Sequence, residues 1–141
     1  MVKFAHASLS CKDPLAIERF YTKHFGFQRA RVVPIGDEQI VFLRAGEVYL
    51  ELFQAHGESP VPRYDKDGPV YPCIRHIAFQ VDDIAATLAA MGADARITLG
   101  PIEFNDFIPG WRTVWVSDPG GNIVEISQGY VDQKDPPPFS G

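Results

Sequence analysis

Apolar and polar positions along the first half of the chain follow two different periods. The stretch "KFAHASLS" alternates as a strand does, with His6 and Ser8 on one side and small or apolar residues on the other. The stretch "KDPLAIERFYTKHFGF" then carries apolar residues at helical spacing, with Asp13 placed as the N-cap and Gly26 placed to end the helix. Alternation returns in three further predicted strands, at residues 27–33, 39–45 and 48–54. The first half is therefore predicted to fold as βαβββ.

The second half repeats this order. A strand is predicted in "CIRHIAFQV", a helix in "DDIAATLAAMGA" that ends at Gly92, and strands at residues 93–99, 110–117 and 122–128. The stretch between the halves holds four prolines and two glycines without periodicity, which is typical of a linker. We therefore expect one α+β domain at residues 1–130, with module one at 1–54, the linker at 55–73, module two at 74–130, and a poorly ordered tail at 131–141.

Each half opens with one histidine and closes with one glutamate. His6 and His76 lie on the first predicted strand of each half, and Glu51 and Glu125 lie on the last. Alternation places the glutamates among apolar neighbours, where a carboxylate needs a counter-charge because burying it alone is costly. Two imidazoles and two carboxylates together provide ligands for a divalent cation. The alternative is that the histidines are rim residues and the glutamates pair with arginines, namely Arg44, Arg75 or Arg112.

Six residues near these strands are candidates for the wall of a substrate pocket: Tyr49, Phe53, Phe104, Phe107, Trp111 and Arg112. The first two share the side of Glu51 on their strand, where they are predicted to form an apolar lining. The other four belong to "GPIEFNDFIPGWRTVWV", which either walls the pocket and offers an anion contact or packs as an ordinary loop. His24 and His56 have no counterpart in the other half, and we expect both at the surface.

Composition and charge narrow the partners. The chain has 141 residues, 45% of them hydrophobic, as expected for one globular domain. A formal net charge of -5 without a run of Lys or Arg disfavours nucleic acid and membrane surfaces and favours a small-molecule substrate. No segment approaches the roughly 18 apolar residues of a membrane helix, and the N-terminus is too polar for a signal peptide, so a cytoplasmic location is expected. Cys11 and Cys73 are expected to be reduced thiols.

Four stretches, "HASLSCKDPLAIERFYTKHFGF", "YLELF", "RHIAFQVDDI" and "WVSDPGGNIVEIS", resemble the vicinal oxygen chelate superfamily. This superfamily includes glyoxalase I, methylmalonyl-CoA epimerase, extradiol dioxygenases, and fosfomycin and bleomycin resistance proteins. The resemblance covers residues 3–130 and implies two tandem βαβββ modules whose sheets form a half-open barrel around a metal. It also implies that a divalent ion (Zn, Ni, Co, Mn or Fe) is bound by four matching residues, His6, Glu51, His76 and Glu125.

A complete set of two histidines and two glutamates is most similar to glyoxalase I and the epimerase. The resemblance therefore implies a metal-dependent lyase or isomerase that moves a proton next to a metal-bound carbonyl through an enediolate, with Glu125 or Glu51 as the general base. The segment "LELFQAHGES" departs from glyoxalase I and disfavours glutathione, and no basic cluster marks a site for the phosphates of coenzyme A. The alternatives are an Fe or Mn dioxygenase and a non-catalytic protein that binds a drug or metabolite. Relatives build the barrel from one chain or from two, and a homodimer is favoured because half-open sheets leave apolar edges to cover.

Overall fold

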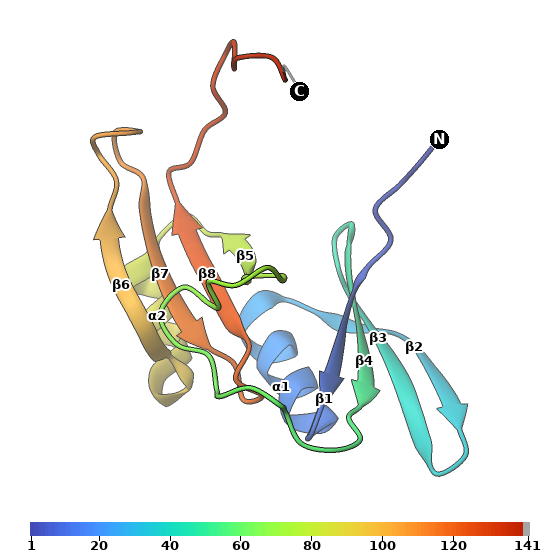
Figure 1. The fold of residues 1–141 in the computed structure, drawn as a ribbon. Coiled ribbons are helices and arrows are strands. Elements are labelled where there is room, and N and C mark those ends of the chain that lie inside the picture. The colour runs from blue at the N-terminus through green and yellow to red at the C-terminus, as the bar shows by residue number, and fades with distance from the viewer. Residues whose placement is uncertain (140–141) are drawn as a thin grey trace.

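The computed structural model describes residues 1–139 and consists of two four-stranded sheets, each accompanied by its own helix (Figure 1). Module one contains β1 (Ala7–Cys11), α1 (Pro14–Phe25), β2 (Gln28–Ile35), β3 (Glu38–Ala45) and β4 (Val48–Gln54). Module two contains β5 (Ile77–Gln80), α2 (Ile84–Met91), a short 3-10 helix η1 (Gly92–Asp94), β6 (Arg96–Glu103), β7 (Arg112–Ser117) and β8 (Ile123–Gln128). The sheet orders are β1-β4-β3-β2 and β5-β8-β7-β6, with the first pair of each sheet parallel. The predicted α+β fold and its internal repeat are confirmed.

Both helices begin and end where the sequence predicts. The Asp13 carboxylate accepts a hydrogen bond from the Ala16 amide at 3.1 Å, and Asp83 caps α2 in the same way. Gly26 follows α1 in the left-handed conformation, with φ of 72°, and its amide donates to the Tyr21 carbonyl. These caps satisfy backbone groups that helix ends otherwise leave free, which explains why the boundaries are readable from sequence.

The first strand of each module starts later than the alternation predicts. His6 and His76 were expected on these strands, but pairing begins one residue after each of them, at Ala7 and Ile77. Both histidines therefore lie at the entry to a strand. In module two, β6 begins at Arg96, because the residues before it form η1.

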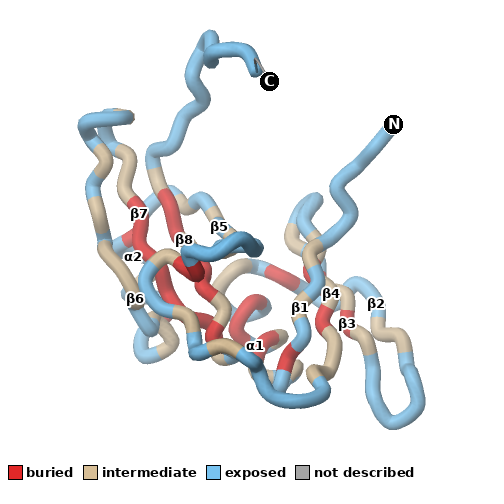
Figure 2. Tube along the Cα trace, in the orientation of Figure 1, coloured by how far each residue is buried: buried red, intermediate tan, exposed pale blue. Residues whose placement is uncertain are grey.

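One hydrophobic core joins the two modules. Ile17 and Tyr21 of α1 are buried together with apolar residues from the helix-facing side of both sheets. Phe25, at the end of α1, stacks on Phe79 of β5 with ring centroids 4.4 Å apart. Figure 2 shows the buried residues concentrated on α1 and on the strands around it. Because both sheets turn their helix-facing sides toward this shared core, their opposite sides face away from it.

A buried carboxylate ties the modules together. Asp118, in the turn between β7 and β8, is fully buried and accepts a 2.7 Å hydrogen bond from the Tyr21 hydroxyl of α1. Its other oxygen accepts bonds from the backbone amides of Gly120 and Asn122, both at 2.9 Å. The carboxylate thus stabilises its own turn and the contact between that turn and module one.

The segment from β4 to β5 runs under module one and then along the module-two sheet (Figure 1). Arg63 donates to the Ser117 hydroxyl at 3.3 Å, and Thr98 of β6 donates to the Lys66 carbonyl at 2.6 Å. Residues 131–139 form an exposed extension without helix or strand, whereas residues 140 and 141 of the predicted tail lie outside the described residues. Across residues 1–139, no helix is long and apolar enough to cross a membrane.

The two remaining histidines differ in their surroundings. His56 is exposed, as expected, and pairs with Glu38 at 2.8 Å. The expectation that His24 lies at the surface is wrong, because its side chain is only 3% exposed and contacts Asp94 of η1 at 2.8 Å. His24 follows the apolar stripe of α1, so the helical period carries it toward module two.

Candidate metal-binding site

Each module brings its own histidine and glutamate together. His6 Nε2 lies 3.1 Å from Glu51 Oε1, and His76 Nε2 lies 3.2 Å from Glu125 Oε1. We call His6 with Glu51 half-site one and His76 with Glu125 half-site two. They lie on equivalent parallel strand pairs, β1–β4 in module one and β5–β8 in module two. In each pair, the glutamate lies opposite the residue two positions after the histidine.

The arginines that could have neutralised the glutamates contact other carboxylates. Arg44 pairs with Glu47 at 3.8 Å, Arg75 with Asp67 at 3.3 Å, and Arg112 with Glu103 at 3.7 Å. Among residues 1–139, the ion-pair partner of each site glutamate is the histidine of its own module. The alternative in which arginines balance Glu51 and Glu125 is therefore wrong.

Glu51 has a second partner that the sequence argument did not identify. The Ser8 hydroxyl donates a hydrogen bond to Glu51 Oε1 across the β1–β4 pair. In module two, Ala78 occupies the matching position opposite Glu125 and has no hydroxyl to donate. Alternation had placed Ser8 on the side of His6, so the signal was present in the sequence, but its partner was not.

His76 is oriented by the linker. Its Nδ1 lies 2.6 Å from the backbone carbonyl oxygen of Asp67. Because a carbonyl oxygen only accepts hydrogen bonds, Nδ1 carries a proton, and Nε2 is the ring nitrogen that faces Glu125. At 3.2 Å from Glu125 Oε1, Nε2 either donates to the carboxylate as an imidazolium N–H or, when unprotonated, can bind a cation together with it. Half-site two thus places an imidazole nitrogen and a carboxylate oxygen side by side, and both are donor types that divalent metals bind.

A tryptophan beside half-site two also escaped the sequence argument. Trp115 pairs with Glu125 in the β7–β8 register, and its ring centroid lies 6.4 Å from that of His76. The side chain is 6% exposed, and its Nε1 is buried without a hydrogen-bond partner among the described residues. Most residues of β7 are buried on both sides of the sheet. Alternation therefore gives no signal that would place Trp115 next to His76.

The two half-sites do not meet within one chain. Among residues 1–139, no three His, Cys, Asp or Glu side chains lie close enough together to hold a metal ion. The reason is the shared core: each half-site lies on the side of its sheet that faces away from the other module. A single chain therefore presents two separate pairs of ligands, and the four-ligand set remains a prediction.

The predicted pocket residues are distributed over several places. Tyr49 lines a hollow of about 350 Å³ together with His6 and Phe42, next to half-site one. Trp111 lines one of about 360 Å³ with Glu125 and Tyr130, next to half-site two. These two residues are thus brought to the candidate ligands, one in each module.

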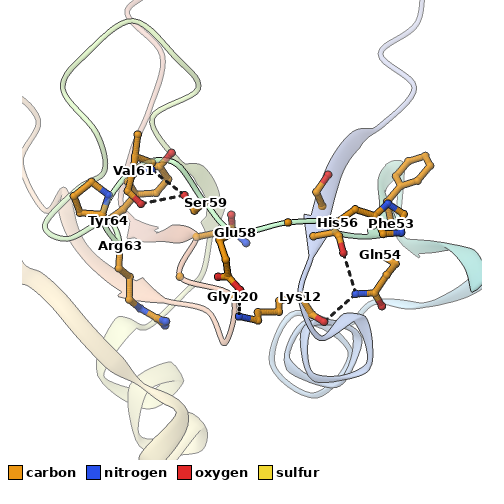
Figure 3. Close-up of a pocket in the computed structure, with 16 residues that line it drawn as sticks. Lys12, Phe53, Gln54, His56, Glu58, Ser59, Val61, Arg63, Tyr64 and Gly120 are labelled. Carbon is orange, nitrogen blue, oxygen red and sulfur yellow. Dashed lines mark hydrogen bonds and ion pairs between the residues drawn. The ribbon is translucent and has the colours of Figure 1, made fainter.

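Phe53 lines a larger hollow, of about 760 Å³, between the linker and the ends of β1 and β4 (Figure 3). Lys12 and Glu58 meet at 2.8 Å across it. Ser10 lines the same hollow and lies opposite Phe53 in the strand register, two pairs beyond Ser8 and Glu51 and on the same side of the sheet. The hollow therefore continues the half-site-one side of the sheet toward the linker.

The remaining candidates, Phe104, Phe107 and Arg112, line neither of the hollows next to the half-sites. Phe104 contacts Trp111 and Phe107, with ring centroids 4.9 and 6.4 Å away, in the loop between β6 and β7. Trp111 Nε1 donates to the Ser127 hydroxyl at 3.1 Å. Arg112 lies opposite Gln128, and Trp115 lies opposite Glu125. Because Arg112 and Trp115 are three positions apart on β7, their side chains point to opposite sides of the sheet, so Arg112 is on the other side from Glu125. The structure does not bring Arg112 to half-site two.

Solved structures with a similar fold include an enzyme, a metal complex and a binding protein. A lactoylglutathione lyase from Agrobacterium tumefaciens is 26% identical, over 92% of this chain and 95% of that one, with a TM-score of 0.58. The fosfomycin resistance protein FosX from Listeria monocytogenes, complexed with Mn(II) and sulfate, is 14% identical, over 93% and 95%, with a TM-score of 0.65. TnmS3, an antibiotic-binding protein from Streptomyces sp. CB03234, is 18% identical, over 92% and 98%, with a TM-score of 0.63.

These likenesses establish a shared fold across proteins with different roles. Among curated proteins, none matches the chain in sequence. A family model described as the glyoxalase/bleomycin resistance protein/dioxygenase superfamily matches residues 3–126, which include all four candidate ligands. The chain belongs to the glyoxalase/bleomycin resistance protein/dioxygenase superfamily.

Proposed function

We propose that this protein is a metal-dependent lyase or isomerase of the glyoxalase or epimerase type that acts as a homodimer. Each of its two metal sites combines half-site one of one copy with half-site two of the other. The observation that supports this most is the equivalent pairing of histidine with glutamate in both modules, at 3.1 and 3.2 Å. Two imidazole nitrogens and two carboxylates suit a divalent cation of the Zn, Ni, Co, Mn or Fe series.

The edges of the sheets support an assembly of two copies. β1 and β5 are edge strands, and each half-site lies at the strand pair next to that edge. Exposed apolar side chains flank both edges, with Phe4 75% exposed before β1 and Ile74 83% exposed before β5. Placing β1 of one copy beside β5 of another covers these side chains and brings the complementary half-sites together.

A bound divalent cation supplies a Lewis acid that polarises a substrate carbonyl and makes the neighbouring carbon acidic. The chain supplies the base for that proton. We assign this role to Glu125, because the Ser8 hydroxyl holds the carboxylate of Glu51 whereas Ala78 lies opposite Glu125. Glu125 also borders the hollow that contains Trp111 and Tyr130, which offers room for a substrate beside the carboxylate.

Cation binding and its location are tested by complementation. The variants His6→Ala and His76→Ala are purified separately, mixed under conditions that exchange subunits, and titrated with Zn²⁺ by calorimetry. Each variant alone lacks a ligand in every site. In a mixed dimer, one of the two sites receives an intact half-site from each copy, so random exchange restores about a quarter of the wild-type sites. A metal site contained within one chain gives no restoration, and that result refutes the shared site.

The reaction class is tested by proton exchange. The metal-loaded protein is incubated in D₂O with a panel of 2-hydroxy and 2-oxo carbonyl compounds, and deuterium uptake at the carbon next to the carbonyl is followed by NMR. We expect uptake with at least one compound and a loss of about 100-fold or more in Glu125→Gln. Oxygen consumption with catechols in the Fe(II) form indicates a dioxygenase instead. Tight binding of panel compounds without exchange or oxygen uptake indicates a binding protein.

A further inference from the structure

We propose that the linker turn, residues 65–68, is a positioning element that fixes the orientation and tautomer of His76. The proposal rests on the metal site proposed above and adds a residue set outside the four ligands. Its basis is the 2.6 Å contact between His76 Nδ1 and the backbone carbonyl oxygen of Asp67. Outer groups of this kind hold metal-binding imidazoles in place and set which ring nitrogen is free.

The turn is anchored on both sides. The Gly68 amide donates to the Asp65 carbonyl at 3.0 Å and closes the turn. Thr98 of β6 donates to the Lys66 carbonyl at 2.6 Å. Lys66 has a φ of 51° and is the only non-glycine residue with a positive φ among residues 1–139. A strained backbone conformation persists only where surrounding contacts hold it. The linker turn is therefore held in one defined conformation by its hydrogen bonds.

The turn also contacts the residue before His76. The Asp67 carboxylate pairs with Arg75 Nε at 3.3 Å. Gly68 has a φ of 111°, and a β-carbon at this position would overlap the carbonyl oxygen of Arg75. Only glycine therefore allows the linker to approach closely enough for the Asp67 carbonyl to reach the imidazole.

The two half-sites are fixed by different means. In half-site one, the Ser8 hydroxyl holds the carboxylate, while His6 has an edge contact with Phe42 at 5.7 Å between ring centroids. In half-site two, the linker holds the imidazole and leaves Glu125 without a hydroxyl partner opposite it. The linker turn thus orders His76 before any cation arrives, which lowers the entropic cost of binding.

The proposal is tested by the ring nitrogens of His76 in metal-free protein. Long-range ¹H–¹⁵N NMR is recorded about two pH units above the usual histidine pKa. Unaltered protein is expected to show the Nδ1–H tautomer. Gly68→Ala and Thr98→Val are expected to shift His76 toward a mixture of tautomers and to weaken Zn²⁺ binding about 10-fold or more. Gly57→Ala is the matched control, because Gly57 is a linker glycine with φ of 93° and open space around its missing β-carbon.

The outcomes separate positioning from folding and from the metal site itself. Thr98→Val removes one hydroxyl and keeps the shape of the side chain, so it decides the question if Gly68→Ala does not fold. A predominant Nε2–H tautomer in unaltered protein overturns the proposal, and so does an unchanged His76 signal in a folded Gly68→Ala variant. Failure of the unaltered protein to bind Zn²⁺ overturns the metal site instead, while the ring signal still decides whether the turn orients His76.

Discussion

Ser8 donates a hydrogen bond to the carboxylate of Glu51 directly across the parallel β1–β4 pair, whereas the equivalent position opposite Glu125 is occupied by Ala78. The two modules are therefore repeats that differ at one functional position. The difference assigns one carboxylate to a fixed position and leaves the other free of that restraint.

Substitutions at Ser8 and Ala78 test what this difference means for cation binding. Ser8→Ala removes the hydroxyl that holds Glu51, and we expect about a 10-fold loss of Zn²⁺ affinity, the lower end of the effect of an outer hydrogen-bond partner. Ala78→Ser places a hydroxyl opposite Glu125, and we expect it to bind Zn²⁺ at least as tightly as unaltered protein but to exchange substrate protons more slowly. Calorimetry and deuterium uptake measure the two effects. Equal Zn²⁺ affinity of Ser8→Ala and unaltered protein contradicts the role of Ser8.

Loss of the Tyr21 hydroxyl is expected to destabilise the protein. In Tyr21→Phe, one oxygen of the buried Asp118 carboxylate loses its 2.7 Å bond to α1 and retains only the Asn122 side chain. A hydrogen bond to a buried charge contributes about 2 kcal/mol to the free energy of unfolding. Urea denaturation checks the value, with Tyr130→Phe as the control at a side chain that is 46% exposed. Equal destabilisation by both changes would argue against the buried contact.

Stability is expected to fall at high pH because of Cys11. Burial, followed by the negative charges of Asp118 and Asp13, raises the pKa of the Cys11 thiol from 9.0 to about 11. Between these values the unfolded chain releases a proton that the folded chain retains, so rising pH favours unfolding. The contribution is complete below the unfolded pKa and is lost as pH rises through the folded one, a change on the order of 2 kcal/mol.

The measurement is urea unfolding from about pH 8 to about pH 10, compared between unaltered protein and Cys11→Ala. The variant is expected to lose less stability over this interval, whatever its stability at pH 8. Tyr21, whose pKa is also raised by burial and by Asp118, keeps a residual slope at the upper end of the range in both proteins. Parallel slopes would show that the Cys11 thiol loses its proton over the same pH range in the folded and unfolded states, which contradicts a raised pKa.

Local features of this fold are readable from sequence because they have local causes. Asp13 and Gly26 mark the ends of α1 through hydrogen bonds that span only a few residues. Strand alternation likewise places His6 and Glu51 on one side of module one, and the repeat extends that placement to module two.

Features that depend on how the modules pack were not predictable in the same way. Alternation indicates which side of each sheet is apolar, but not that both apolar sides share one core around α1 and thereby separate the half-sites. The linker contact that orients His76 has no sequence signal. Its acceptor is the backbone carbonyl of Asp67, and every residue type at this position would provide the same atom. His24 was misplaced for a related reason, since its partner Asp94 belongs to the other module.

Because the half-sites are separate within one chain, a substitution at the β5 edge tests whether two copies must associate to form the metal site. Ile74 precedes half-site two, is 83% exposed, and in the proposed dimer is covered by the β1 edge of the second copy. Burial of an isoleucine side chain contributes about 2 kcal/mol, so Ile74→Lys is expected to raise the dimer dissociation constant more than 10-fold. The control is Ile97→Lys, at an exposed side chain on β6, the opposite edge of the same sheet. Light scattering across a concentration series measures the dissociation constant, and Zn²⁺ titration of the same samples is expected to show sites lost in proportion to monomer. A monomeric Ile74→Lys variant that retains its Zn²⁺ sites would show that one chain closes the site alone.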